Sequence, residues 1–539
     1  MGFSLSAADV AIIVGSLVVT VWLGLRAAKQ RGTSASGYFL ASRTLPWWLI
    51  GPGIVATSVS SEQIVGTVGA AYKSGMAIAN WEWFTLPTYT LVMVFCIPMY
   101  IRNRIGTVPE FFAKRFGPLC ADIYSWVLLT AYVLVFLVTV LYGGSLAFSE
   151  LTGWNFYAVL WVMTVLVGIY TAKGGLLSVM WTDAAQCVML LGGGLLLYFV
   201  ALSQIPGGWA AMAAANPDRF HLYQPPSHPV APFPALVFLA VNIGLWYQGT
   251  NQVMIQRVLG ARSTWDGVLG TIFAGFINFL RPLVTCFLGF VVYHLVHVME
   301  AAPPLANQDS AFPFALRHLA PSWGLRGIVL AGFLAAVMST LSSLVNSSAT
   351  VFAFDVYKKR LRRGASDAEI VRAGQIAAAA ALVVAAVIAP AVEHLGGIFR
   401  YFQTALTYAA TPFVSVFILG LLWKRANYKG ALFGIIGGSA IVAVMAVGLP
   451  WLDAALGWGL NLHWLYIGFA AQIITMVGIV LVSLRSEPPS PSQWEPFVWR
   501  TAWLRELDAE GGRKPWYRRL WVWYGIYALI WFYLYWRYW

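Results

Sequence analysis

The chain has 539 residues, of which 59% are hydrophobic and only 10% charged, and its mean hydropathy is +0.71. This composition lies far outside that of soluble domains and predicts a membrane protein with many spans. The formal charge of +13 would suit a nucleic-acid-binding protein, but the basic residues lie in short clusters between apolar segments, so membrane topology explains them better. The four cysteines show no CxxC spacing and indicate neither a disulfide framework nor a metal site.

Fourteen apolar segments are long enough to cross a bilayer, since about 20 residues are needed for one helical crossing. In chain order the expected spans are 7–27, 45–72, 80–101, 121–150, 156–172, 176–203, 234–256, 267–298, 324–354, 368–391, 397–423, 429–449, 463–484 and 518–537. Twenty-six of the 34 basic residues, Arg257 among them, fall in the odd-numbered loops between these spans. Because basic loops stay in the cytoplasm, both termini are expected outside a multi-pass protein of the cell membrane.

The second expected span contains the stretch GPGIVATSVSSEQIVGTVG at 51–69, which is rich in glycine and hydroxyl residues. A helix broken within hydrocarbon is tolerated only where its freed amides are buried in protein or line a wet cavity. A second interrupted segment, VNIGLWYQGTNQVMIQ at 241–256, begins a second group of five spans. Paired broken helices are typical of transporters, in which they bind the ion and the solute. A proline kink, with hydroxyls bonded back to the helix, is the alternative for a single break.

A third polar cluster, GFLAAVMSTLSSLVNSSAT at 332–350, lies within an otherwise apolar segment. Three serines share one face of this helix with a threonine beside it, namely Ser339, Ser342, Ser343 and Thr340. Hard oxygen ligands of this kind suit an alkali cation. Hydrogen bonds between neighbouring helices are the alternative role for these hydroxyls.

Acidic residues inside membrane spans are costly and therefore mark functional candidates. Three are present, namely Glu62, Glu82 and Asp183. Asp183, in the stretch GGLLSVMWTDAAQ, is the best candidate for a residue on the ion path. Its alternative role is to cap the end of a nearby helix.

Six motifs together resemble the sodium/solute symporter family, and most closely its sodium/glucose cotransporter branch. They are YFLASRTLPWWLIGPGIVATSVSSEQIVGTVGAAY, ANWEW, TAKGGLLSVMWTDAAQ, LWYQGTNQVMIQRVLGARS, AAVMSTLSSLVNSSATVFAFDVYKK and YFQTALTYAATPFVSVFILGLLWKR. The resemblance implies an all-α polytopic fold of about 14 transmembrane helices, with an inverted five-plus-five repeat of the leucine-transporter type and alternating access. On this basis the chain divides into an additional N-terminal helix and linker (1–36), the transport core (37–430), two additional helices (431–485), a cytoplasmic linker (486–517) and a C-terminal helix (518–539).

The resemblance also implies that sodium is the coupling ion and indicates where it binds. The principal sodium site maps to the backbone carbonyls of Ala56 and Val59 and, opposite them, to Ala336, Ser339 and Thr340. An additional site of some relatives maps to Asp183, Ser339, Ser342 and Ser343, so that one or two sodium ions are expected per cycle. The alternative is that these serines join helices while Asp183 lines the inner exit route.

The solute positions of the cotransporters map to Gln63, Glu82, Tyr247, Asn278 and Gln403. Two partners differ from the family pattern, because Gly244 stands in place of a polar residue and Asn278 in place of a lysine. Arg281 either binds a carboxylate substrate or bonds to carbonyls freed ahead of Pro282, and the structural role is favoured. The expected function is sodium-coupled symport of a small polar solute, with a sugar favoured; an organic anion such as a sugar acid, or an amino acid, is the alternative.

An enzyme is not expected, because the sequence shows no Ser/His/Asp arrangement, metal motif or phosphate loop. A sodium-conducting channel or sensor is weakly disfavoured, since no signalling domain follows the core. The expected partners are the solute, sodium ions and the lipid bilayer, without nucleic acid; protein partners are not indicated by the sequence.

Overall fold

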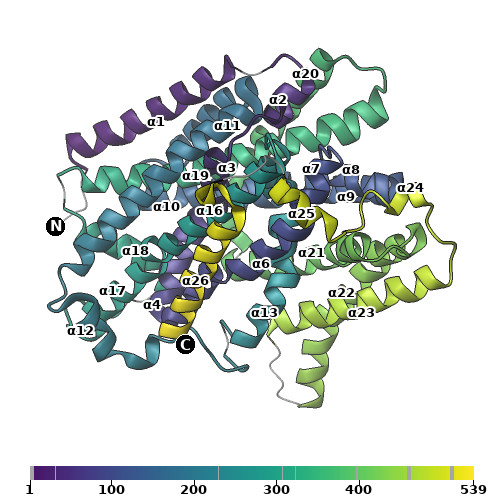
Figure 1. Ribbon diagram of the computed structural model, residues 1–539. Helices are drawn as coiled ribbons and strands as arrows, with labels where there is room; N and C mark the ends of the chain where they lie inside the picture. The colour runs from purple at the N-terminus through teal and green to yellow at the C-terminus, as the bar shows by residue number, and fades with distance from the viewer. Residues whose placement is uncertain are drawn as a thin grey trace.

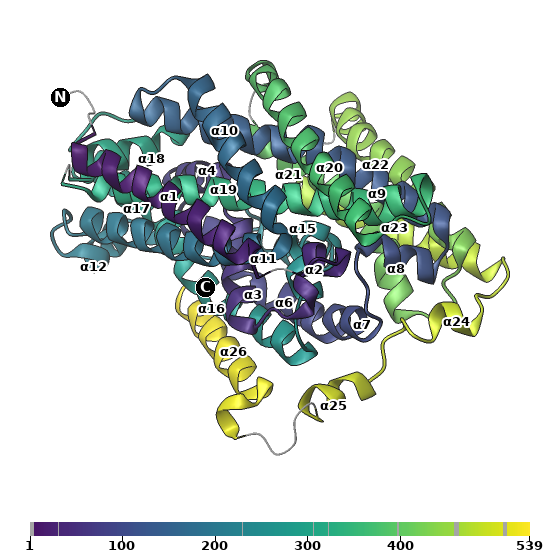
Figure 2. The same cartoon turned by 90° about the horizontal axis from the view of Figure 1, so that it is seen from above.

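The computed structural model describes residues 5–30, 32–228, 230–305, 307–321, 323–395, 398–457, 463–509 and 515–539. Regular structure in these ranges is helical, and the β-type pairing within them is a single isolated bridge between Leu45 and Ala261. The longer helices are α1 (Ala7–Ala28), α9 (Pro118–Thr130), α10 (Leu137–Thr152), α11 (Phe156–Leu202), α16 (Thr264–Val284), α17 (Cys286–His297), α19 (Leu325–Val351), α20 (Asp367–Ile388), α21 (Ile398–Leu422), α22 (Tyr428–Leu456), α23 (Trp464–Leu484) and α26 (Leu520–Arg537). In both overall views α22 and α23 lie at the opposite end of the molecule from α1 (Figures 1 and 2).

Shorter helices connect or extend the long ones. They are α2 (Ala35–Leu40), α3 (Trp47–Ser58), α4 (Ser61–Ser74), α5 (Asn80–Trp83), α6 (Thr85–Leu91), α7 (Ile97–Arg102), α8 (Val108–Arg115), α12 (Gly208–Ala215), α13 (Phe233–Val241), α14 (Ile243–Leu245), α15 (Gln252–Leu259), α18 (Ala311–Phe314), α24 (Pro491–Trp494) and α25 (Ala502–Ala509). Within the described residues, nine helical stretches are long and apolar enough to cross a membrane. The expectation of an all-helical, multi-pass protein is confirmed, whereas the count of fourteen spans stays a prediction.

Helix α11 contains a reversal of the chain at Gly175. Tyr170 and Ser178 would be about 12 Å apart along a continuous helix. Instead, a Cβ built on Gly24 of α1 would lie 2.8 Å from Tyr170 Cβ and 2.9 Å from Ser178 Oγ. The backbone of Gly175 has φ 58° and ψ −153°, which L-residues avoid, so glycine permits the turn. This turn falls between two of the expected spans, 156–172 and 176–203.

The first broken helix is interrupted at Val59, where the backbone is extended between α3 and α4. The sequence had suggested a break caused by glycine and proline, but Pro52 lies inside α3, well before the interruption. The glycines of this stretch allow close packing instead. A Cβ on Gly51 would lie 2.5 Å from Phe273 Cδ1, and one on Gly53 would lie 2.8 Å from Met180 Cε.

The second broken helix is interrupted twice. Asn242 departs from helical geometry between α13 and α14, and Asn251 is extended between a π-helical stretch, Trp246–Thr250, and α15. Both asparagines are buried, and Asn251 Oδ1 caps α15 by accepting from the backbone N–H of Val253. Both segments that the sequence indicated as interrupted are therefore broken helices in the structure.

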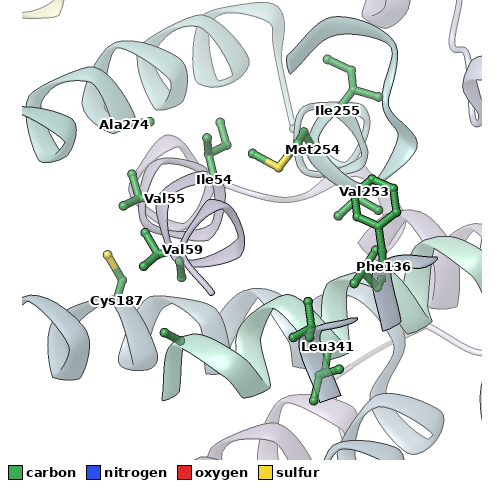
Figure 3. Packing of buried hydrophobic residues seen from close by; sticks show 14 of the residues in the cluster. Ile54, Val55, Val59, Phe136, Cys187, Val253, Met254, Ile255, Ala274 and Leu341 are labelled. Carbon is green, nitrogen blue, oxygen red and sulfur yellow. The ribbon is translucent and has the colours of Figure 1, made fainter. Parts of the chain in front are cut away.

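Helix α19 forms the centre of the bundle, and every residue from Val329 to Val351 is buried. Small residues bring α11 against it, since a Cβ on Gly193 would lie 2.8 Å from Ile328 O and one on Gly332 would lie 2.8 Å from Met189 O. Figure 3 shows apolar side chains of α3, α11, α15 and α19, among them Val55 and Leu341, near Val59 at the end of α3. This packing holds the broken segment of α3 between the helices that carry the polar clusters.

Helix α26 lies along α16 and the segment that contains α5 and α6 (Figure 1). Its side chains hydrogen-bond to that segment at several heights: Tyr524 to Thr90 at 2.9 Å, Tyr527 to Thr85 at 3.0 Å, Trp531 Nε1 to Trp83 O at 2.8 Å, and Tyr535 to Asn80 at 2.7 Å. The short helix α5, which carries Glu82, is thereby supported from outside the bundle.

Candidate functional site

A cavity of about 880 Å³ leads from the break in α3 toward the surface. Its inner end is lined by Thr57, Ser58 and Thr340, and its outer end by residues of two polar loops, including Asp218 and Gln308. These loops follow the sixth and the eighth of the expected spans, and the expected topology, with both termini outside, places them outside the membrane as well. Small-molecule sites typically have volumes of about 300–1,000 Å³, so the cavity is large enough for a small solute and its entry path.

Two titratable groups at the mouth of the cavity have shifted pKa values. Burial raises the pKa of the Asp309 carboxyl, and desolvation lowers the pKa of His228. A neutral His228 agrees with its contacts, because Nδ1 accepts hydrogen bonds from the backbone N–H groups of Val230 at 3.3 Å and Ala231 at 3.0 Å.

Residues expected to form the principal sodium site come together at the inner end of this cavity. Thr340 Oγ1 is 3.2 Å from each of three carbonyl oxygens, those of Thr57, Val59 and Ala336. Ala56 lies one residue before Thr57 and is buried with it. The carbonyls of Thr57 and Val59 lie at the break after α3, and with Thr340 Oγ1 and Ala336 O they form a group of hard oxygens that fits a small alkali cation.

The carboxylate of Asp183 forms a second polar centre, which is fully buried. Ser339 Oγ donates to Oδ1 at 2.7 Å, while Ser343 Oγ and Thr57 Oγ1 lie 3.4 Å and 3.3 Å from Oδ2. Ser342 Oγ instead donates to the carbonyl of Ser339 at 3.0 Å. Of the residues expected at an additional sodium site, the structure therefore brings Ser339 and Ser343 to Asp183.

Arg257 is part of this centre, which the sequence did not indicate. Its Nη2 lies 2.9 Å from Asp183 Oδ2 and also contacts Thr57 Oγ1 and Ser343 Oγ. Arg257 is only 1% exposed, so its assignment to a basic cytoplasmic loop was wrong. The available signal was its position directly after the second broken segment, 241–256.

The solute positions expected from the sequence are partly brought together. Gln63, Tyr247 and Asn278 line the cavity, and Asn278 Nδ2 donates to the hydroxyl of Tyr89, another lining residue, at 3.0 Å. The side chain of Gln403, on α21, lies outside the described part of the structure.

Glu82 is buried behind the cavity wall, where it pairs with Arg281, a residue of the lining. Arg281 Nη2 lies 3.4 Å from Glu82 Oε1, and Thr285 Oγ1 donates to Oε2 at 2.8 Å. Arg281 Nη1 also donates to Asn278 Oδ1 at 3.0 Å and to Ser58 Oγ at 3.3 Å. Arg281 thus connects Glu82 with Ser58, the residue that precedes the break after α3.

Gly244, which stands where the family has a polar side chain, packs against the hydroxyl of Thr88. A Cβ on Gly244 would lie 2.8 Å from Thr88 Oγ1 and 2.8 Å from Leu239 O. Thr88 and Gly244 both line the cavity. The hydroxyl of Thr88 therefore occupies the space into which a larger residue at position 244 would project.

A helical membrane bundle with two broken helices, a cluster of carbonyl and hydroxyl oxygens, and an adjacent polar cavity defines a transporter that couples a small cation to a solute. The chain belongs to the sodium:solute symporter family, which it matches over residues 38–438. It is a sodium-coupled symporter and not an enzyme, and Na⁺ is its coupling ion.

Several relatives are similar over most of their length. The chain is 33% identical to a sodium/glucose cotransporter of Vibrio parahaemolyticus, over 83% of this chain and 86% of the relative. It is 29% identical to the human sodium/myo-inositol cotransporter, over 91% of this chain and 75% of the relative. The substrate-bound, outward-open structure of a Na⁺-coupled sialic acid symporter superposes with a TM-score of 0.80 at 20% identity, over 90% of this chain and 99% of that one. The fold is therefore that of this transporter, which is of the leucine-transporter type.

Proposed function

We propose that this symporter imports a small, neutral, polyhydroxylated solute, most favourably a sugar. The observation that carries the proposal is the pairing of Glu82 with Arg281, which leaves no net charge from these two groups beside the inner cavity. Around them, Gln63, Asn278 and Tyr89 offer both donors and acceptors, as a solute with several hydroxyl groups requires. The relatives named for glucose and myo-inositol transport, at about 30% identity, support the same class of solute.

The proposed architecture has fourteen transmembrane helices, with a ten-helix inverted repeat over residues 37–430 and both termini outside. One additional helix precedes this core, and two more and a linked C-terminal helix follow it. The two broken segments are the first helices of the two repeats and face each other across the transport path. Sodium binds at the principal site, held by the residues Ala56, Val59, Ala336, Ser339 and Thr340.

Uptake by the purified protein in proteoliposomes tests the proposed solute class. Neutral sugars and cyclic polyols, sugar acids and amino acids are offered separately under an inward sodium gradient, and choline replaces sodium in the control. We expect concentrative uptake of a neutral sugar or polyol that is lost in choline. Uptake confined to acids or amino acids would contradict the proposal.

Truncation of the expected solute residues should separate solute binding from ion binding. Gln63→Ala and Gln403→Ala each remove hydrogen bonds to the solute, at about 1–3 kcal/mol per lost partner, and should raise the solute concentration for half-maximal uptake far more than the sodium concentration. Gln375→Ala is the matched control, because its amide donates to Ala172 O at 2.8 Å on another helix, away from the cavity lining. Equal solute affinity in all three variants would remove Gln63 and Gln403 from the site.

A sugar acid is the second candidate solute, favoured by one observation. Arg281 Nε is buried and has no hydrogen-bond partner among the described residues, so the guanidinium retains a donor. If a carboxylate binds there, Arg281→Gln should abolish uptake of the acid, whereas uptake of a neutral solute should fall only as far as the loss of the ion pair with Glu82 lowers it.

A further inference from the structure

The buried centre at Asp183 already contains a positive charge supplied by the protein. Arg257 Nη2 lies 2.9 Å from Asp183 Oδ2 and contacts the hydroxyls of Thr57 and Ser343. An additional sodium ion held by Asp183 and Ser343 would need these same oxygens. The guanidinium nitrogen therefore stands among the ligands that such an ion would use.

Charge as well as space prevents Arg257 and a sodium ion from binding Asp183 at the same time. In the described part of the chain Asp183 is the carboxylate with which Arg257 pairs, and the two side chains are 0% and 2% exposed. One carboxylate balances one cation, and a second cation would leave an uncompensated charge deep within the helical bundle, where ionised groups are strongly disfavoured. Sodium can bind at Asp183 only after the guanidinium has withdrawn.

We propose that Arg257 acts as a tethered cation that competes with a sodium ion for Asp183. The inference rests on the solute transport and the principal sodium site proposed above, and it adds a residue that controls ion binding at the second centre. With Arg257 in place, as in this structure, Asp183 is neutralised and the principal site at Thr340 alone is available to sodium. When Arg257 withdraws, Asp183, Ser339 and Ser343 become free to hold a second ion.

Three features of the structure suit such an exchange. Arg257 lies on α15, two turns beyond the extended residue Asn251, so movement at this break would carry the guanidinium toward or away from Asp183. Gly53 of α3 faces the side chain, since a Cβ there would lie 3.3 Å from Arg257 Nε, and this leaves room for the guanidinium. Its Nε has no hydrogen-bond partner in the described residues, so that atom does not hold the arginine in place.

Thr57 connects this centre to the principal sodium site. Its carbonyl oxygen lies 3.2 Å from Thr340 Oγ1, while its hydroxyl contacts Arg257 and lies 3.3 Å from Asp183 Oδ2. A sodium ion bound at Thr340 would lie beside the carbonyl of the same residue whose hydroxyl contacts the guanidinium. A single residue thereby links the two centres, through its main-chain carbonyl at one and its hydroxyl at the other.

The test measures the sodium dependence of solute uptake in proteoliposomes for Arg257→Gln, Arg257→Lys and the matched control Arg262→Gln. Arg262 pairs with Asp266 at 2.6 Å, with its side chain 54% exposed. Arg257→Gln, which removes the competing charge, should lower the sodium concentration for half-maximal uptake by at least fivefold and raise the Hill coefficient toward two. Arg257→Lys, a cation with fewer contacts, should lie between wild type and Arg257→Gln, and Arg262→Gln should match wild type.

A double variant shows whether Asp183 is the group for which the cations compete. Adding Asp183→Asn to Arg257→Gln should cancel the gain in sodium affinity. Identical sodium dependence in Arg257→Gln and Arg262→Gln overturns the inference. If Arg257→Gln does not fold, the inference is overturned when Arg257→Lys has the same sodium dependence as the wild type. A wild-type protein without sodium-driven uptake would defeat the proposed function, whereas equal sodium dependence in active variants defeats this inference alone.

Discussion

Glu82→Gln and Arg281→Gln, made separately and together, should show that the two buried charges are needed chiefly for each other. At 3.4 Å and an effective dielectric constant of about 20, their attraction amounts to about 5 kcal/mol before desolvation is subtracted. Removal of one partner from a buried pair typically costs about 3–5 kcal/mol, because the other charge is left uncompensated. The double variant restores neutrality and keeps two amides that can hydrogen-bond, so it should recover about 2–4 kcal/mol relative to the summed single effects.

Thermal stability of the detergent-solubilised protein provides the readout, followed as the fraction that stays monodisperse after heating. The expected order is wild type, then the double variant, then either single variant. Solute uptake by the double variant should exceed that of both single variants. A double variant as unstable as the sum of the two singles would show that Glu82 and Arg281 act independently, and the argument for a neutral cavity would fail.

Three further substitutions address the ion site, the cavity wall and the helix reversal. Thr340→Val removes one oxygen at nearly constant volume and should raise the sodium concentration for half-maximal uptake by about five- to 150-fold, for a loss of about 1–3 kcal/mol. Thr340→Ser keeps the hydroxyl and should stay close to wild type. Equal sodium dependence of the two variants would exclude the hydroxyl as a ligand. Gly244→Ala should destabilise the protein by about 1–3 kcal/mol, because the added Cβ would meet Thr88 and Leu239 O. Adding Thr88→Ala to this variant should restore part of the lost stability. No restored stability would mean that the contact with the backbone oxygen of Leu239 dominates. Gly175→Ala places an L-residue at a positive φ and puts its Cβ 2.2 Å from Tyr38 O. This variant should greatly reduce the yield of folded protein, as measured by size-exclusion chromatography. A normal yield would contradict the tight reversal of the chain at Gly175.

The helical, membrane-spanning fold could be predicted because hydrophobicity and chain length determine it locally. The interruption of the second span was also visible in its polar composition, but its position was not. Glycine and proline at 51–53 suggested the break, whereas the extended residue is Val59, beside Thr340 of a distant helix. The place where a helix opens depends on what the freed carbonyls contact, and those contacts are not local in sequence.

Arg257 shows most clearly what sequence patterns leave out. Counting basic residues near the ends of spans treats each one as exposed to the cytoplasm, which is the usual case. Arg257 is buried because Asp183, 74 residues earlier in the chain, lies within hydrogen-bonding distance. In the same way, the loss of a side chain at Gly244 becomes understandable only when Thr88 is seen beside it. Pairings of this kind emerge from packing between helices.

The hydrogen bonds between α26 and the segment around Glu82 have a consequence for biosynthesis. They join residues that are 434 to 455 positions apart, so the helix that presents Glu82 enters the membrane long before its outer partners have been translated. During that interval the buried Asn80 and the backbone of Trp83 lack these bonds. Assembly of the solute site would then be among the late events of folding, and a nascent chain stalled before α26 would expose an incompletely braced α5 to membrane quality control.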